Sequence, residues 1–552
     1  MIWKLAVVCV FIAIAVGVGL YARRSASSVD GFVLGGRNVG PWLSAFAYGT
    51  SYFSAVIFVG YAGQFGWRFG LSATWAGIGN ALLGSLLAWW VLGPRAREMT
   101  HRLGATTMPE FFGKRFDSKA LRIAAAAIIF VFLIPYTASV YNGLSRLIVI
   151  AFGIDVPYEY CIIVMAVVTA IYVVLGGYMA TVMNDFIQGI VMLIGIVLVI
   201  VFVLNGHGGF SEAIVTLSQI QADGTEMQGA FVSFFGPDLV NLIGVVILTS
   251  LGTWGLPQMV QKFYAIKSGP AVKQGAIIST VFAFVIAGGS YFLGGFGRLA
   301  SLVPETAQYI EYSASGAIVY DSIMPALVSN IPDILLGVLV VMVLSASMST
   351  LSSLVLTSSS TLTLDLIKDN MVKDMDEKKQ VVWMRVLLVV FIAISAAIGI
   401  IQVSGSLPFI AQLMGISWGA LAGAFLGPFL WGLYSGKVSK AAVWTSFIVG
   451  VALTTGNMLT GNGIAIALFG TAAGNPINVG ALAMILSIVI VPVVSLFTPS
   501  VPFEIAPPSA KGAGDRAFEA ATAGQEISAE TQGKGIEGAA ADSIAVPPHR
   551  KA

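Results

Sequence analysis

Charged residues are scarce in this chain. Asp, Glu, Lys and Arg make up 10% of its 552 residues, whereas soluble domains carry about 25%. Hydrophobic residues make up 57%. A chain with so few charges cannot cover a water-facing surface, so we predict a polytopic membrane protein surrounded by a lipid bilayer. The net charge of only +2 excludes partners that need a basic surface, such as a nucleic acid.

Cysteine and histidine are also rare. Cys9 and Cys161 both fall in apolar runs, which excludes a disulfide framework and a cysteine metal cluster. The three histidines, His101, His207 and His549, are scattered, and the sequence holds no HExxH or CxxC motif. A catalytic metal is therefore not expected. We predict that the protein is not an enzyme.

What the chain has instead is a series of apolar runs of about 20 residues, the length that spans a bilayer as a helix. These runs predict an all-α polytopic membrane protein with about thirteen transmembrane helices. The first, Ile2–Tyr21, is longer than the core of a signal peptide and is predicted to be retained. We expect a transmembrane domain over residues 1–508, with its first helix at 1–24 and its last two helices at about 441–498. The remainder, 509–552, is rich in Ala, Gly, Glu and Ser and predicts a disordered tail.

Basic residues are distributed unevenly between the loops. With the N-terminus placed outside, twenty Lys and Arg residues fall in inner loops and four in outer loops. Lys262 is among those assigned to an inner loop. Because positive loops stay in the cytoplasm, this asymmetry predicts an external N-terminus, a cytoplasmic tail and insertion in the plasma membrane, which is the inner membrane of a bacterium.

Two apolar runs are interrupted by residues that weaken helices. The second run contains AYGTSYFSA at 47–55, and the seventh contains SLGTWGLPQ at 250–258. They lie five spans apart, which is typical of inverted-repeat transporters that bind their ions and solutes at such breaks. The alternative is two ordinary kinks, since Gly and Pro are common in membrane helices.

The ninth run ends in a stretch unusually rich in hydroxyl groups, Ser345–Ser360. On a helix, Ala346, Ser349, Thr350 and Ser353 share one face. Neutral oxygen atoms suit a small hard cation such as Na⁺, so this face is predicted to line an ion pathway. The alternative is that the hydroxyls only pack helices together.

Asp185 lies in GGYMATVMNDFIQG, residues 176–189, at the start of the sixth run. An ionisable group at this depth marks a candidate functional site. The alternative is a helix N-cap, in which the carboxylate accepts hydrogen bonds from free backbone amides.

The same stretch resembles the signature of the sodium:solute symporter family in its glycine pair, its Asp and its Gln188. Met348–Ser353 (MSTLSS) resembles the family's ion-binding helix, and Leu34–Trp42 (LGGRNVGPW) resembles its entry to the first core helix. The resemblance covers about residues 1–500. It implies a five-plus-five inverted repeat of the leucine-transporter type, with repeats at about 41–206 and 238–433.

The resemblance also implies ion sites. The family's common Na⁺ site would use backbone carbonyls of Thr50, Phe53 and Ala346 and the hydroxyls of Ser349 and Thr350. Some members have a second Na⁺ site, which here would comprise Asp185, Ser349, Ser352 and Ser353. Asp185 could instead contact only groups of the inner gate.

The solute pocket in this family lies beside the two breaks. The candidates there are Tyr52, Ser54, Phe58, Tyr141, Trp254, Gln258 and Gln412. Ile57 and Ala76 stand where sugar carriers are expected to have polar groups, and Tyr52 stands where bacterial proline carriers have an acidic residue. A small organic acid or amino acid is therefore favoured over a sugar, and proline itself is disfavoured.

These features predict Na⁺-coupled uptake of a small organic solute by alternating access, with Na⁺ as the coupling ion. No obligate protein partner is implied. Two alternatives remain open at this stage: a proton-coupled carrier on the same fold with Asp185 as proton site, and a transporter-like sensor or channel.

Overall fold

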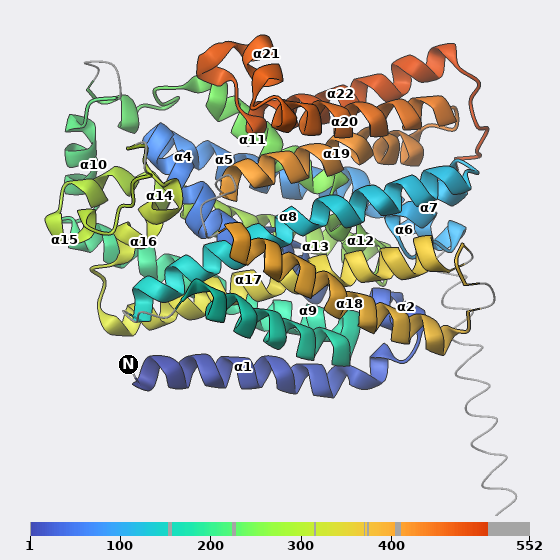
Figure 1. Cartoon of the computed structure of the whole chain (residues 1–552), viewed down its shortest axis with the longest axis horizontal. Helices are drawn as coiled ribbons and strands as arrows, with labels where there is room; N and C mark the ends of the chain where they lie inside the picture. Colours follow the sequence, from blue (N-terminus) through green and yellow to red (C-terminus); the bar gives the residue numbers. More distant parts are fainter. Residues whose placement is uncertain are drawn as a thin grey trace, which may run out of the picture. The chain divides into compact units, whose positions relative to one another are not determined.

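The computed structural model describes residues 2–152, 157–222, 228–313, 316–368, 370–372, 375–402 and 410–505. Within these ranges the chain is helical, and its only β-structure is a few isolated bridges. Figure 1 shows the helices in chain order. The first half contains α1 (Ile2–Ala22), α2 (Val29–Leu34), α3 (Pro41–Tyr52), α4 (Ala62–Phe69), α5 (Thr74–Gly79), α6 (Ala88–Leu103), α7 (Met108–Arg115), α8 (Lys119–Phe152), α9 (Tyr158–Gly206) and α10 (Phe210–Gln219).

The second half contains α11 (Leu239–Gly255), α12 (Pro257–Tyr264), α13 (Gly269–Ala283), α14 (Gly289–Gly294), α15 (Pro304–Ala307), α16 (Ile323–Val328), α17 (Asp333–Thr361), α18 (Glu377–Ile401), α19 (Ile410–Tyr434), α20 (Lys440–Leu459), α21 (Gly463–Ala473) and α22 (Pro476–Phe497). Four π-helical segments continue or join these helices: η3 (Val56–Tyr61), η5 (Asn80–Leu87), η7 (Phe284–Gly288) and η10 (Leu362–Ile367). The predicted tail, 509–552, lies outside the described residues.

By length and composition, ten helices in the described part could cross a membrane, or eleven when the bent pair α11–α12 is included. Two of them are too long for one crossing, because Val56–Leu103 has 48 residues and α9 has 49. Each contains a glycine with positive φ, Gly70 (φ 61°) and Gly177 (φ 54°). Division at these two glycines would give the thirteen spans that the sequence predicts.

Contacts with α1 show that α9 turns back on itself at Gly177. Before the glycine, the backbone of Tyr172 packs against Gly19. Beyond it, the Asn184 amide donates to the Ala15 carbonyl at 3.2 Å. From Tyr172 to Asn184, twelve residues of straight helix would extend about 18 Å. Their partners on α1, Gly19 and Ala15, are four residues apart and therefore only about 6 Å from each other. The second half of α9 therefore runs back towards its start, and Asp185 follows closely after this turn.

The hydroxyl-rich helix α17 occupies the interior of the bundle. Its residues from Val340 to Thr361 are all buried, including every Ser and Thr. By contrast, α1, α9, α18 and α22 expose large apolar side chains, for example Val10, Ile194, Val382 and Val489. Such a surface is stable in hydrocarbon, so these helices form the lipid-facing shell around a core that carries the polar groups.

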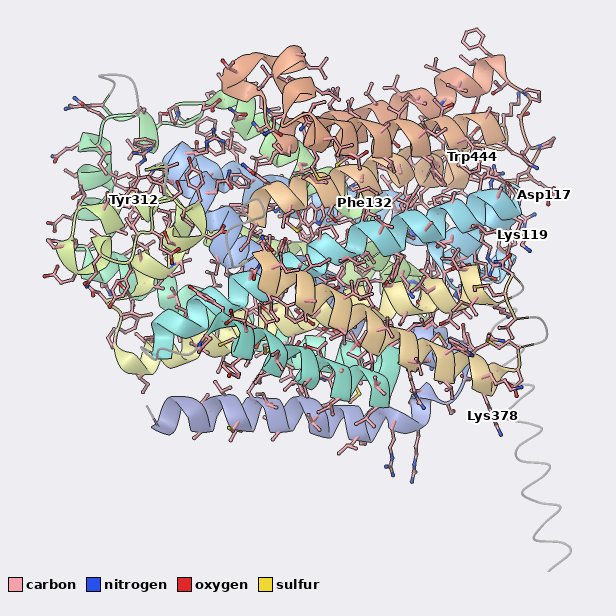
Figure 2. All side chains as sticks on the ribbon, viewed as in Figure 1. Asp117, Lys119, Phe132, Tyr312, Lys378 and Trp444 are labelled. Atoms are coloured by element: carbon pink, nitrogen blue, oxygen red, sulfur yellow. The ribbon has the colours of Figure 1, made fainter. Side chains whose placement is uncertain are left out.

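Two of the lysines predicted for inner loops, Lys119 and Lys378, lie at one end of the bundle (Figure 2). Figure 2 shows Asp117, Lys119 and Lys378 at one end, Phe132 in the interior and Tyr312 at the opposite end. The N-terminus lies at the same end as Tyr312, α10 and α15 (Figures 1 and 2). This places two of the predicted inner-loop lysines at the end opposite the N-terminus.

Candidate functional site

The first broken helix is α3, which stops at Tyr52. Phe53 leaves the helical region with φ −92° and ψ 85°, although its N–H still donates to the Gly49 carbonyl at 3.0 Å. The Ser54 hydroxyl then accepts the Val56 N–H at 3.1 Å and starts the next helical segment, η3. Because the helix stops here, carbonyls of its last turn lose their helical partners and become available to other groups.

Four oxygen atoms from α3 and α17 converge at this break. The Ser349 hydroxyl lies 2.9 Å from the Thr50 carbonyl oxygen and 3.0 Å from that of Ala346. The Thr350 hydroxyl lies 3.2 Å and 3.1 Å from the same two carbonyl oxygens. All three α17 residues and Thr50 are fully buried. The structure therefore brings together four of the five residues predicted for the common Na⁺ site, and Phe53 lies three residues beyond Thr50 at the break itself.

The chemistry of this cluster fits Na⁺. Its members are two carbonyls and two hydroxyls, all neutral oxygen donors of the kind that hard cations prefer. Each hydroxyl has one hydrogen and can donate to only one of the two carbonyls at a time. The cluster is thus richer in lone pairs than in hydrogens, which is the condition for accepting a cation.

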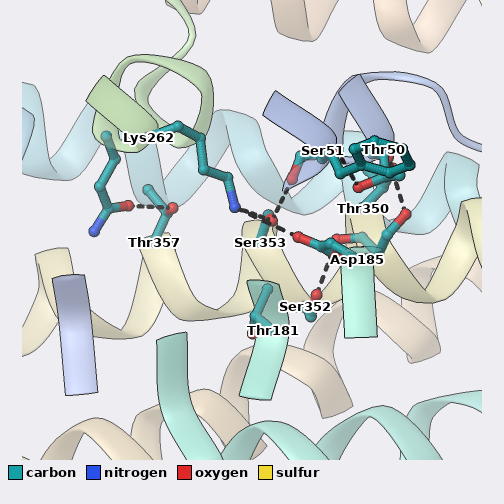
Figure 3. A network of polar contacts seen from close by, with 12 residues as sticks. Thr50, Ser51, Thr181, Asp185, Lys262, Thr350, Ser352, Ser353 and Thr357 are labelled. Carbon is teal, nitrogen blue, oxygen red and sulfur yellow. Dashed lines mark hydrogen bonds and ion pairs between the residues drawn. The ribbon is translucent and has the colours of Figure 1, made fainter. Parts of the chain in front are cut away.

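The four residues predicted for a second Na⁺ site come from two helices, Asp185 from α9 and Ser349, Ser352 and Ser353 from α17, and Ser352 and Ser353 lie about one turn beyond Ser349 and Thr350. Asp185 is fully buried, and its carboxylate oxygens make no hydrogen bond in the described part of the chain. It is therefore not a helix N-cap, and α9 continues past it in both directions. Ser353 lies close to this carboxylate, as Figure 3 shows. The Ser352 hydroxyl instead donates to the Ser349 carbonyl of its own helix at 2.9 Å.

The sequence-based position of Lys262 in an inner loop is wrong. The structure buries this residue, with 2% of its surface exposed, inside the broken span formed by α11 and α12. The two helices meet at a bend of 46°, and α12 continues through Pro257–Tyr264. Pro257 fits at the start of a helix, so it begins α12 rather than ending the span. The Lys262 ammonium lies 3.8 Å from the Asp185 carboxylate.

A small cavity lies between the two broken helices. Tyr52 and Phe53 from the first break line it together with Thr253 of α11 and Asn80 of η5. The carbonyl of Gly84, which also lines it, accepts hydrogen bonds from Tyr48 on α3 and Thr253 on α11, both at 2.8 Å. The two breaks are therefore adjacent, as an inverted repeat requires.

Of the predicted solute-binding residues, Tyr52 and Gln258 have the positions best suited to that role. Tyr52 lines the cavity, and its hydroxyl donates to the Thr249 carbonyl. Gln258 is buried at the second break, in the first turn of α12, and neither its amide oxygen nor its amide nitrogen has a hydrogen-bond partner in the described residues. A buried amide without hydrogen-bond partners destabilises the protein unless another group supplies them.

The other candidates are mostly occupied by packing or by local bonds. The Trp254 indole donates to the Leu83 carbonyl at 2.9 Å. Phe58 lines a separate apolar cavity with Ile196 and Leu293. Tyr141 is buried in α8, and Gln412 is half-buried in α19. The Ser54 hydroxyl accepts a hydrogen bond from the Val56 N–H.

Sequence reasoning missed Trp418 of α19, which is 1% exposed beside the first break. The Tyr52 ring stacks on it at a centroid distance of 5.2 Å, and the rings of Tyr136 and Tyr61 lie 5.7 Å and 6.3 Å away. One aromatic residue in an apolar run is too common to single out. Only the fold shows that four aromatic rings meet here.

Two adjacent broken helices inside a lipid-facing shell, with an oxygen cluster at one break, define a secondary transporter. Comparisons with known proteins agree. Residues 32–450 match the family model described as the Sodium:solute symporter family, and the chain belongs to this family. It is a multi-pass membrane transporter that couples solute uptake to Na⁺, and not an enzyme.

Two individual relatives found by sequence share 28–30% of their aligned residues with this chain. The chain is 28% identical over 455 residues to a sodium/proline symporter of Salmonella typhimurium, covering 80% of this chain and 85% of the relative. It is 30% identical over 454 residues to a sodium/proline symporter of Staphylococcus aureus, covering 80% and 83%. A solved Na⁺-coupled sialic acid symporter shares the fold, with a TM-score of 0.67 at 17% identity over 91% of this chain and 99% of that one.

Proposed function

We propose that this chain takes up a small carboxylate solute, an amino acid or an organic acid, together with Na⁺ bound at the cluster of Thr50, Ala346, Ser349 and Thr350. The observation that carries the proposal is the convergence of these four oxygens on the break in α3. Na⁺ bound there supplies a charge that holds α3 against α17. Its loss on the inner side frees the two helices to separate, a population shift by differential binding.

The carboxylate class rests on the polarity of the second break. The cavity residues Tyr52, Phe53, Asn80 and Thr253 are neutral, so no fixed charge there selects a cationic solute. The start of α12 presents the positive end of a helix dipole, and Gln258 adds an amide that can donate. The solutes named for the relatives, proline and sialic acid, both carry a carboxylate.

Uptake by purified protein in sealed vesicles tests this function. A panel of radiolabelled amino acids including proline, of organic acids, sialic acid and a hexose is offered with an inward Na⁺ gradient and with K⁺ in its place. We expect Na⁺-dependent accumulation of one carboxylate class and none of the hexose. Accumulation that follows a proton gradient and ignores Na⁺ would refute the proposal.

Gln258 is expected to bind the solute rather than the ion. Replacing it in Gln258→Leu removes the only amide at the second break that lacks a partner in the described residues, so we expect the solute concentration for half-maximal uptake to rise about tenfold, equivalent to one hydrogen bond of about 1.4 kcal/mol. The Na⁺ concentration for half-maximal uptake should stay within about twofold.

The matched control is Gln380→Leu. Gln380 is also buried, but its amide donates to the Met375 carbonyl at 2.7 Å, away from both breaks. Its loss should leave solute affinity unchanged. Equal effects of the two substitutions would show that Gln258 acts only through packing.

The external N-terminus and cytoplasmic C-terminus are part of the proposal. The loop asymmetry of basic residues supports them, and so does the position of Lys119 and Lys378 at the end of the bundle opposite the N-terminus (Figures 1 and 2).

Single cysteines test this orientation in a background where the exposed Cys9 and buried Cys161 are replaced by Ser. We expect Ser218→Cys and Ser313→Cys to react with a membrane-impermeant maleimide in intact cells. Ser118→Cys and Ser435→Cys should react only after permeabilisation. Labelling of Ser118→Cys in intact cells would reverse the assigned orientation.

A further inference from the structure

Lys262 and Asp185 form an ion pair in the interior of the bundle. Their side chains are 2% and 0% exposed, and they come from different halves of the chain, Asp185 from α9 and Lys262 from α12. In Figure 3 dashed lines join the Lys262 ammonium to the Ser353 hydroxyl and to the Asp185 carboxylate. A buried ion pair of this kind is a poor source of stability, because the desolvation of both charges offsets their attraction. Its presence therefore needs an explanation other than stability.

The surroundings of the ammonium are those of a cation site. Its Nζ atom donates to the Ser353 hydroxyl at 3.0 Å and lies 3.8 Å from the nearer Asp185 oxygen. The ring of Tyr178 lies 5.1 Å away and presents its electron-rich face. The Ser353 hydroxyl is in turn 2.7 Å from that of Ser51, two residues before the break in α3. Groups from α9 and α17 thus surround the positive charge that α12 carries, and Ser51 of α3 is linked to them through Ser353.

The Asp185 carboxylate accepts no hydrogen bond from the described residues in this arrangement. Both Asp185 oxygens are buried, and neither has a hydrogen-bond partner in the described part of the chain. At 3.8 Å the ammonium neutralises the carboxylate without a close hydrogen bond. Asp185 and Ser353 are also two of the four residues predicted for a second Na⁺ site. The Lys262 ammonium therefore contacts two of the residues predicted to bind that ion.

We propose that the Lys262 ammonium is a tethered cation that replaces a second Na⁺, so that this chain binds and moves one Na⁺ per transport cycle. A Na⁺ ion at Asp185 would lie within a few ångströms of the ammonium and be repelled by it in a site shielded from water. The charge that neutralises Asp185 is therefore part of α12 and stays with the protein. This inference rests on the proposed function, because it presupposes Na⁺ at the cluster of Ser349 and Thr350.

Counting bound ²²Na⁺ per chain on purified full-length protein tests the inference. We expect one ion in the wild type and one in Asp185→Asn. In Lys262→Met, which removes the charge and keeps the length of the side chain, we expect two. The double variant Lys262→Met with Asp185→Asn should return to one, and Lys262→Arg, which keeps the charge, should stay at one.

The outcomes separate this inference from the proposed function. Two ions in the wild type that fall to one in Asp185→Asn would overturn the tethered cation while leaving Na⁺ coupling intact. One ion in a folded Lys262→Met would also overturn it. If Lys262→Met does not fold, the number of ions bound by the wild type and by Asp185→Asn still tests whether Asp185 holds a second Na⁺. No saturable ²²Na⁺ binding in the wild type would instead refute the proposed function itself.

Discussion

Removing both hydroxyls of the oxygen cluster, in Ser349→Ala with Thr350→Val, is expected to raise the Na⁺ concentration for half-maximal uptake about 100-fold. Each hydroxyl is an oxygen ligand to a charge, and a bond to a charged group contributes about 1.5–3 kcal/mol. Losing two therefore costs about 3 kcal/mol or more, and each 1.4 kcal/mol is about tenfold in affinity. The measurement is initial solute uptake against Na⁺ concentration in vesicles, at fixed membrane potential.

The matched control is Ser345→Ala with Ser347→Ala on the same helix. These hydroxyls are equally buried, but they donate to the Val341 and Val343 carbonyls of α17 itself, at 2.7 Å and 2.8 Å. The control should change Na⁺ dependence by less than about threefold, since it leaves all four oxygens of the cluster in place. An unchanged Na⁺ dependence in Ser349→Ala with Thr350→Val would remove these residues from the ion site.

The substitution Arg122→Met is expected to destabilise the protein by about 3–5 kcal/mol, because it leaves the Asp365 carboxylate buried without a counter-charge. Asp365 in η10 is fully buried, and the guanidinium of Arg122 lies 2.6 Å from it. The Thr107 hydroxyl donates to its other oxygen at 2.6 Å. The network ties the start of α8 and the cap of α7 to the end of the hydroxyl-rich segment. The measurement is the thermal unfolding midpoint of the detergent-solubilised protein.

Adding Asp365→Asn to Arg122→Met should recover much of the loss, since a neutral amide needs no counter-charge there. The comparison substitution is Lys440→Met, which breaks an exposed pair with Asp117 at 3.8 Å and should cost less than about 1 kcal/mol. If Arg122→Met costs no more than Lys440→Met, Asp365 is not held as a buried charge by Arg122.

Local sequence patterns predict much of this architecture. Hydrophobic runs give the membrane helices, glycine marks the break near Thr50, and glycine with proline marks the break near Gly255, because these residues weaken a helix. The hydroxyl face of α17 also follows from helical spacing alone, and the structure turns Ser349, Thr350 and Ser353 towards α3.

The remaining features depend on contacts between segments far apart in the chain. The sequence places Lys262 in an inner loop, and only the structure shows that α12 continues past the bend at Leu256 into the core. The Arg122–Asp365 pair joins residues 243 positions apart, and no local pattern indicates it. Likewise, the stacking of Tyr52 on Trp418 depends on how α19 packs against the break.

The most direct test of the account is equilibrium binding of ²²Na⁺ to the purified protein in the absence of a solute gradient. The account predicts saturable binding in the wild type and in Ser345→Ala with Ser347→Ala, and its loss at the same Na⁺ concentrations in Ser349→Ala with Thr350→Val. Wild-type binding that persists with the same affinity in Ser349→Ala with Thr350→Val would contradict the claim that the break in α3 and the hydroxyls of α17 hold the coupling ion.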